Sequence, residues 1–180
     1  TKDMDLMGGL GKLMPYTAFC FLIGTMAISA LPPFNGFVSE WFTYQSLFTL
    51  SQSDDFVLKL AGPIAIIMLA LTGALAALCF VKVYGISFGG APRSEKAANA
   101  REVPKPMVIA MAVLALCCVL LGVGASVVTP IIAKISTALA HSESLMLAQN
   151  GVVVAQAEPH TALSTPMVTI MLLAFFFLPF

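Results

Sequence analysis

One carboxylate, Glu40, is unusual because it follows a helix-breaking sequence inside a long apolar segment. The residues that break the helix come directly before it: Pro32, Pro33, Asn35 and Gly36. A carboxylate at the centre of a membrane helix costs about 2.5–3.5 kcal/mol on insertion scales. Proline removes backbone donors, so carbonyls upstream of it need water, an ion or a side chain as partner. The combination predicts a site where backbone and charge face something other than lipid.

Proton transfer is the chemistry that Glu40 best fits. Desolvation favours the neutral carboxyl group, whereas a nearby cation favours the carboxylate. A group held between these effects gains and loses a proton near neutral pH, as a proton relay requires. A structural or interfacial ion pair is the alternative role. Lys82 is the second candidate, either as a relay partner at the cytoplasmic mouth or as a lysine whose amine reaches the membrane surface.

The other polar residues point to no catalytic, metal or cofactor site. No nucleotide-binding, serine-hydrolase or zinc-protease motif occurs. His141 and His160 have no obvious third ligand. The cysteines lack metal or haem spacing, and we expect them to be small buried hydrophobic side chains. Four residues near Glu40 either bind water along a polar path or bond to their own helix backbone: Ser29, Asn35, Ser39 and Thr43.

The composition places the chain among integral membrane proteins. It is 59% hydrophobic and 10% charged, whereas soluble domains are about 25% charged. Its 9 basic and 9 acidic residues balance, so charge gives no reason to expect nucleic-acid binding. Apolar runs predict membrane helices over residues 16–50, 63–88 and 107–128, and another from residue 166. Residues 16–50 would measure about 50 Å as one helix, so two half-helices joined at 31–36 fit a core of about 30 Å best.

Lysine and arginine counts predict the orientation of these helices. The 89–106 loop is the most basic, whereas the 51–62 and 129–165 loops each have one lysine, Lys59 and Lys134. Since basic loops stay in the cytoplasm, we expect 89–106 inside and the other two loops outside. The broken segment 16–50 then runs outward, with Lys2 and Lys12 inside. Residues 130–147 form an amphipathic stretch suited to the membrane interface.

Two stretches make the chain resemble the antiporter-like membrane subunits of respiratory complex I and its relatives. They are Met-Gly-Gly-Leu-Gly-Lys-Leu-Met-Pro at 7–15 and Ile-Ser-Ala-Leu-Pro-Pro-Phe-Asn-Gly-Phe-Val-Ser-Glu at 28–40. Within that superfamily, residues 31–41, 81–88 and 91–93 look most similar to the large membrane subunits of formate hydrogenlyase and hydrogenase-4-type complexes. The resemblance covers residues 1–106, and residues 107–128 fit only in hydropathy.

The resemblance implies an all-α integral membrane fold, a fragment of an antiporter-like helical bundle in which residues 16–50 form one discontinuous transmembrane helix. Residues 1–128 would be the C-terminal part of the antiporter-like domain, and 129–180 an external loop with the start of an extra membrane helix. Glu40 would be the terminal proton-transfer group of the channel's outer half, a position held by lysine in some members. No quinone, flavin, iron–sulfur or other cofactor is implied for this chain.

We therefore expect a non-catalytic membrane subunit of a hydrogenase or complex I-like assembly, conducting protons or sodium ions. Electron transfer would belong to other membrane and peripheral subunits. The expected location is the inner membrane of a bacterium or archaeon, crossed several times. The alternatives are a subunit of a multisubunit cation/proton antiporter and a purely structural membrane anchor. We expect the chain to be an internal piece of a larger subunit or a natural truncation, so that Glu40 needs partners outside it.

Overall fold

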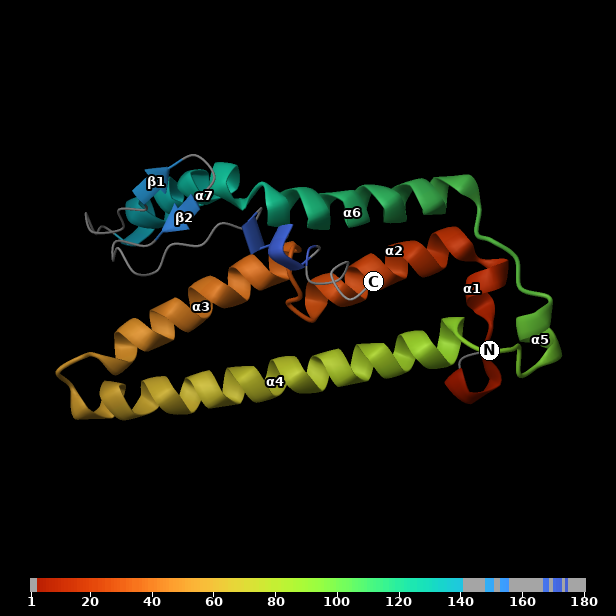
Figure 1. The fold of residues 1–180 in the computed structure, drawn as a ribbon, viewed down its shortest axis with the longest axis horizontal. Coiled ribbons are helices and arrows are strands. Elements are labelled where there is room, and N and C mark those ends of the chain that lie inside the picture. Colours follow the sequence, from red (N-terminus) through yellow and green to blue (C-terminus); the bar gives the residue numbers. More distant parts are fainter. Residues whose placement is uncertain are drawn as a thin grey trace. The chain divides into compact units, whose positions relative to one another are not determined.

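The computed structural model describes residues 3–140, 148–150, 153–155, 167–168, 170–172 and 174 (Figure 1). The chain divides into two compact units, residues 1–29 with 64–118 (unit 1) and residues 30–63 with 119–180 (unit 2). The elements are a 3-10 turn at Met4–Leu6, α1 (Leu10–Leu13), α2 (Pro15–Ile28), α3 (Asn35–Ser51), α4 (Phe56–Phe88), α5 (Glu95–Ala98), α6 (Lys105–Val123), α7 (Ala125–Ala140), β1 (Ala148–Asn150) and β2 (Val153–Ala155).

Helices dominate the part of the chain that the structure describes, as predicted. The exception is a hairpin of two short strands, in which β1 pairs antiparallel with β2. Among the described residues, two helices are long and apolar enough to cross a membrane, α4 and α6, each with a mean hydropathy of 2.7. None of the most apolar stretch of α4 is buried by the chain itself. Such a surface suits lipid, because soluble proteins rarely leave a large apolar area in water.

The predicted helix break is present. α2 ends at Ile28 and α3 begins at Asn35, and between them Ala30 has a φ of 51° and Phe34 is extended. Pro32 and Pro33 lie in this interruption, as predicted. Asn35 and Gly36 do not, because the first turn of a helix needs no intrahelical N–H partners and α3 can start as soon as Phe34 ends the extended segment. The helix break is therefore residues 29–34.

α4 begins earlier than predicted. The predicted start was residue 63, where the apolar run begins with a proline. In the structure Pro63 lies inside α4, and the helix begins at Phe56. The Asp55 side chain accepts a hydrogen bond from the Val57 amide at 3.0 Å and so caps the helix. The predicted 51–62 loop is correspondingly short, and Lys59 belongs to α4.

The predicted helix 107–128 is divided at Gly124. α6 ends at Val123, and α7 then runs through the start of the predicted external loop. The amphipathic stretch predicted at 130–147 is helical as far as Ala140, and residues 141–147 lie outside the described part. The domain boundary expected after residue 128 falls within α7 and stays a prediction. Beyond it, residues 167–168, 170–172 and 174 have helical backbone.

In unit 1 the first residues of the chain pack against the loop after α4. Gly9 donates a backbone hydrogen bond to Gly89 at 2.8 Å, and the Ser94 hydroxyl donates to the Leu6 carbonyl at 2.7 Å. Figure 1 shows α1 and α5 together beside the C-terminal end of α4. We call this packing of residues 6–11 on residues 88–94 the loop–loop contact. Segments that touch lie on one side of a membrane, so the contact supports the predicted common side of residues 1–15 and 89–106.

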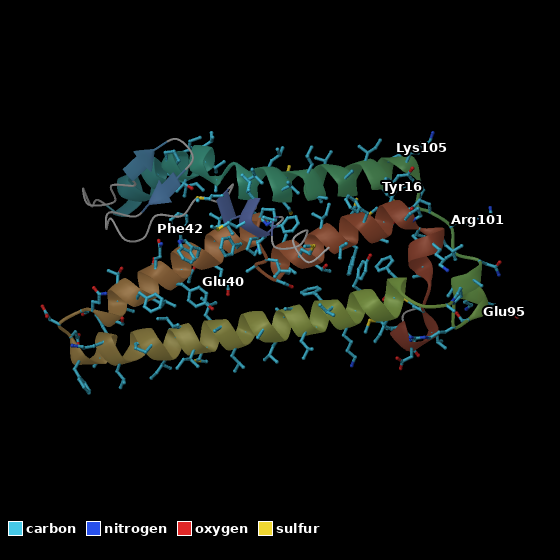
Figure 2. The ribbon with its side chains drawn as sticks, viewed as in Figure 1. Tyr16, Glu40, Phe42, Glu95, Arg101 and Lys105 are labelled. Atoms are coloured by element: carbon cyan, nitrogen blue, oxygen red, sulfur yellow. The ribbon has the colours of Figure 1, made fainter. Side chains whose placement is uncertain are left out.

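Glu102 holds the start of α2 within unit 1. Its carboxylate accepts hydrogen bonds from the Tyr16 amide at 3.0 Å, the Thr17 hydroxyl at 2.6 Å and the Val103 amide at 3.2 Å. The Tyr16 amide is one of the first-turn donors that have no partner within the helix. The hydrogen bond from Thr17, followed by those from the backbone amides, lowers the pKa of Glu102 below its usual range. Figure 2 shows Tyr16 and Arg101 at the same end of unit 1.

Glu102→Gln is expected to destabilise the first turn of α2. It should also remove the loss of stability that this turn shows in acid. A carboxyl group with a lowered pKa stabilises the fold above its ordinary pKa of about 4.3, and this contribution is lost as the pH falls through the lowered value. In the wild-type protein, amide exchange at Tyr16 should therefore accelerate in acid beyond the intrinsic rate. The variant should exchange faster at pH 7 and show no acid step. Glu95→Gln, at an exposed position of α5, is the control, and the prediction fails if both variants behave alike.

The cysteines are less buried than predicted. All four are free; Cys79 and Cys117 are exposed, and Cys20 and Cys118 are partly exposed. The expectation of burial is therefore wrong for Cys79 and Cys117. On a lipid-facing helix an apolar side chain needs no cover from its own chain, so hydropathy does not distinguish the inner face from the outer one. Cys20 and Cys118 line an apolar cavity of about 310 Å³ among α2, α4 and α6 in unit 1.

Candidate functional site

Glu40 lies in the second turn of α3, within unit 2 (Figure 2). α3 starts at Asn35 because Phe34 is extended, with φ −79° and ψ 164°, and the helix break before it cannot continue α2. Phe34 provides no side-chain cap, so the first amides of α3 have no capping side chain. Glu40 is partly buried, and it is the one acidic residue of α3. The end of the helix break therefore sets the start of α3, and with it the position of Glu40 in the second turn of that helix.

Tyr44 is the neighbour of Glu40 that the sequence analysis missed. Its hydroxyl lies close enough to the Glu40 carboxylate for the two groups to interact electrostatically. Both side chains are partly buried. Residues four apart on a helix share a face, so this spacing is the signal that would have identified Tyr44. A hydroxyl beside a carboxylate both donates and accepts hydrogen bonds, so it orients the carboxylate and connects it to water.

Tyr44→Phe is expected to slow any proton transfer through Glu40 without abolishing it. A hydrogen bond to a charged group contributes about 1.5–3 kcal/mol, which corresponds to a rate change of about 10- to 150-fold if the whole of it acts in the rate-limiting step. Ion translocation by the reconstituted protein is the measurement. Tyr16→Phe is the matched control, because Tyr16 is 66% exposed and its contact to Glu102 uses the backbone amide. Equal rates in the two variants would show that the Tyr44 hydroxyl does nothing for Glu40.

Of the polar residues predicted near Glu40, Thr43 has the backbone-bonding role. The Thr43 hydroxyl donates to the Ser39 carbonyl at 3.0 Å, which is ordinary helix–backbone bonding. Ser39 is exposed, and Asn35 is partly buried at the start of α3. Ser29 lies at the end of α2 in unit 1, where its amide donates to the Thr25 carbonyl at 3.1 Å. A polar path along Ser29, Asn35 and Ser39 stays a prediction.

Comparison with known families identifies the segment that carries Glu40. Residues 1–68 match the family described as "NADH:quinone oxidoreductase/Mrp antiporter, TM". This segment includes the helix break, α3 and the start of α4. Residues 1–68 are therefore similar to this family of antiporter-like membrane proteins. The predicted resemblance is therefore confirmed, and with it the assignment of the chain to the membrane proteins.

Curated relatives of the antiporter-like family extend the match along the chain. Hydrogenase-4 component B of Escherichia coli (strain K12) is 49% identical over 179 residues, which are 99% of this chain and 26% of the relative. Formate hydrogenlyase subunit 3 of the same organism is 42% identical over 180 residues, 99% of this chain and 27% of that protein. One Na(+)/H(+) antiporter subunit of Alkalihalophilus pseudofirmus is 28% identical over 115 residues, 63% of this chain and 14% of the relative. The chain thus spans about a quarter of the first two relatives' length.

Lys82, the other predicted proton-transfer residue, is exposed near the C-terminal end of α4 in unit 1. Glu40 belongs to unit 2. The role of Lys82 therefore stays a prediction. His141 and His160 lie outside the described residues. Within the residues that the structure describes, no three His, Cys, Asp or Glu side chains gather in a way that could hold a metal ion.

Proposed function

We propose that this chain forms the outward half of a proton path in an antiporter-like membrane subunit, and that Glu40 carries the proton there. One observation supports this most: Glu40 stands in the second turn of a helix that follows an interrupted backbone, in a chain whose long helices are apolar. Ionisable groups inside membrane proteins are costly and are mostly found on ion pathways. Interrupted helices supply free backbone groups to such pathways.

The chemistry proposed for Glu40 is reversible protonation of its carboxylate. Water reaching the helix break, residues 29–34, would bond to carbonyl groups that no helix occupies. A hydrated carboxylate is stabilised in its charged form, and a dehydrated one takes up a proton. The nearby Tyr44 hydroxyl would donate a hydrogen bond to the carboxylate and so hold it in one orientation for transfer through water. A change in hydration around the helix break would then move the proton on or off Glu40.

The finer architecture follows from the same proposal. α2, the helix break and α3 would form one discontinuous span running outward, because neither half-helix alone reaches about 30 Å at 1.5 Å per residue. The loop–loop contact would lie on the cytoplasmic side, with Lys82 near the cytoplasmic mouth. Residues 1–128 would belong to the antiporter-like domain, and 129–180 would follow it. The chain would sit as a multi-pass protein in the inner membrane of a bacterium or archaeon.

The partners proposed are the subunits of a hydrogenase or complex I-like assembly that transfers electrons. The relatives named hydrogenase-4 component B and formate hydrogenlyase subunit 3 support this, because they match nearly the whole chain. The second candidate function is a subunit of a multisubunit cation/proton antiporter without a redox partner. The 28% identity to a Na(+)/H(+) antiporter subunit over 115 residues favours keeping it as the alternative.

Ion transport by the complete complex in liposomes tests the proposal. With its electron donor, the complex should change the internal pH reported by an enclosed dye, and a protonophore should abolish the change. Replacing sodium by potassium should leave the rate unaltered. Sodium-dependent pH changes without an electron donor would instead favour the antiporter function. No ion movement under either condition would leave only the structural anchor.

A further inference from the structure

The helix break is packed against a glycine of α6 within unit 2. A Cβ atom built on Gly122 would overlap the Pro33 carbonyl oxygen and would lie 2.6 Å from the Phe34 carbonyl carbon and 2.7 Å from its Cα. Real Cβ atoms essentially never come within 3.0 Å of such neighbours. Gly122 is buried, and Phe34 is only 7% exposed. The backbone of α6 therefore touches the backbone of the helix break directly.

The nature of these contacts excludes an easy adjustment. The three atoms nearest to such a Cβ all belong to the main chain, so no side-chain rotation relieves their overlap. Carbon atoms pack at about 3.5–4.0 Å, so a methyl group at position 122 would require a displacement of about 1 Å. Ala125, one turn further along the chain, is 2% exposed, which leaves little space for the displacement within unit 2.

The position of the helix break sets the position of Glu40. Phe34 is the last extended residue, its amide donates to the Leu31 carbonyl at 3.1 Å, and α3 begins at the next residue. Glu40 follows in the second turn of the same rigid helix. A displacement of the break is therefore carried to the carboxylate. Misplacement of a reacting group by about 1 Å can reduce a rate by about 100-fold.

We infer that Gly122 is a positioning residue: its bare backbone seats Pro33 and Phe34 and so fixes where α3 and Glu40 stand. This inference rests on the proton-transfer function proposed for Glu40. Small residues commonly permit close approach of membrane helices. Gly122 differs because the partner is a non-helical turn that precedes an ionisable residue. A substitution there should alter the surroundings of Glu40 while leaving α6 itself helical.

The first experiment measures geometry without requiring any ion transport. Ser39, next to Glu40, is replaced by cysteine in the complete protein after the other cysteines have been removed, and its reaction with a water-soluble maleimide is timed. Gly122→Ala should change this rate by at least about threefold, since reaction rates depend steeply on placement. Gly85→Ala is the matched control, because a Cβ on this helical glycine of α4 meets no atom within 4 Å. Equal labelling in both variants overturns the inference.

The second experiment asks whether the changed geometry matters for the proton. Gly122→Ala should reduce proton translocation by about tenfold or more and shift its pH profile, whereas Gly85→Ala should do neither. Translocation and a pH profile like those of the control overturn the positioning role if Glu40→Gln abolishes transport. If Glu40→Gln also transports normally, the proposed function fails. The labelling experiment then still tests whether Gly122 fixes the position of the helix break and α3.

Poor assembly of Gly122→Ala would not remove the test. A methyl group that displaces the helix break can be accommodated by changes in the break itself. Second-site substitutions that restore assembly should therefore fall within residues 30–36. Restoring substitutions found only elsewhere would overturn the inference, because the three atoms nearest to the added methyl group all belong to Pro33 and Phe34.

Discussion

Glu40→Gln is expected to reduce proton translocation by at least about 100-fold, the lower range for loss of a positioned acid–base group. Glutamine has the size and hydrogen-bonding reach of glutamate but cannot carry the proton. Because Glu40 is only partly buried and lies on the surface of an intact helix, the variant should fold and assemble. The measurement is the internal pH change of liposomes that contain the complete complex.

Two further variants separate the proton from the shape of the site. Glu40→Asp keeps an ionisable carboxyl group but withdraws it by one methylene, so translocation should fall and remain measurable. Glu95→Gln makes the same chemical change on α5, where the side chain is exposed, and should have no effect. Normal translocation by Glu40→Gln in a fully assembled complex would contradict the proposed role, and a structural ion pair would then be the better account of Glu40.

The helix break and Glu40 could be predicted because their signals are local. Two consecutive prolines cannot continue a helix, whatever surrounds them, and a carboxylate in an apolar run is exceptional by composition alone. Residues 1–15 and 89–106 were likewise assigned to one side from their basic residues, and the loop–loop contact agrees. These predictions depend on short stretches of sequence and on the membrane as solvent.

Other features depended on competition between local signals. Pro63 and Asp55 are both residues at which a helix can start, and the predicted helix began at residue 63. The Asp55 cap decides the outcome, because its carboxylate satisfies the Val57 amide and the apolar residues after it extend the helix. Proline inside a membrane helix is tolerated where its surroundings satisfy the freed carbonyl. The sequence alone does not rank the proline at 63 against the aspartate at 55 as a helix start. The hydrogen bond from the Val57 amide to Asp55 does.

Contacts between distant parts of the chain were beyond sequence reasoning. Glu102 caps α2 although it follows Tyr16 by 86 residues in the sequence, and no pattern around Glu102 indicates that partner. Gly122 lies four residues before Ser126, a spacing of small residues that is typical of closely packed membrane helices but names no partner. Its actual neighbours are Pro33 and Phe34 in the helix break. A single sequence shows that a residue is small, but packing decides what approaches it.

Gly9→Ala is expected to destabilise the loop–loop contact by about 2–5 kcal/mol, the sum of a left-handed backbone penalty and an overlap penalty. Gly9 has φ 63° and ψ 10°, a conformation that residues with a Cβ rarely adopt. Its Cβ would lie 2.8 Å from the Pro92 ring and 3.1 Å from the Ala91 carbonyl carbon. Hydrogen–deuterium exchange over residues 3–13 and 88–94 measures the loss of the Gly9–Gly89 hydrogen bond.

Gly90 supplies the control for that experiment from within the same contact. It also has a positive φ, 74°, but a Cβ there would meet no atom within 4 Å. Gly90→Ala should therefore cost only the backbone penalty, about 1–2 kcal/mol. Asparagine tolerates the left-handed conformation, so Gly90→Asn should be close to wild type while Gly9→Asn stays destabilised. Equal losses in Gly9→Ala and Gly90→Ala would mean that the close approach of Gly9 to Pro92 adds nothing to the stability of unit 1.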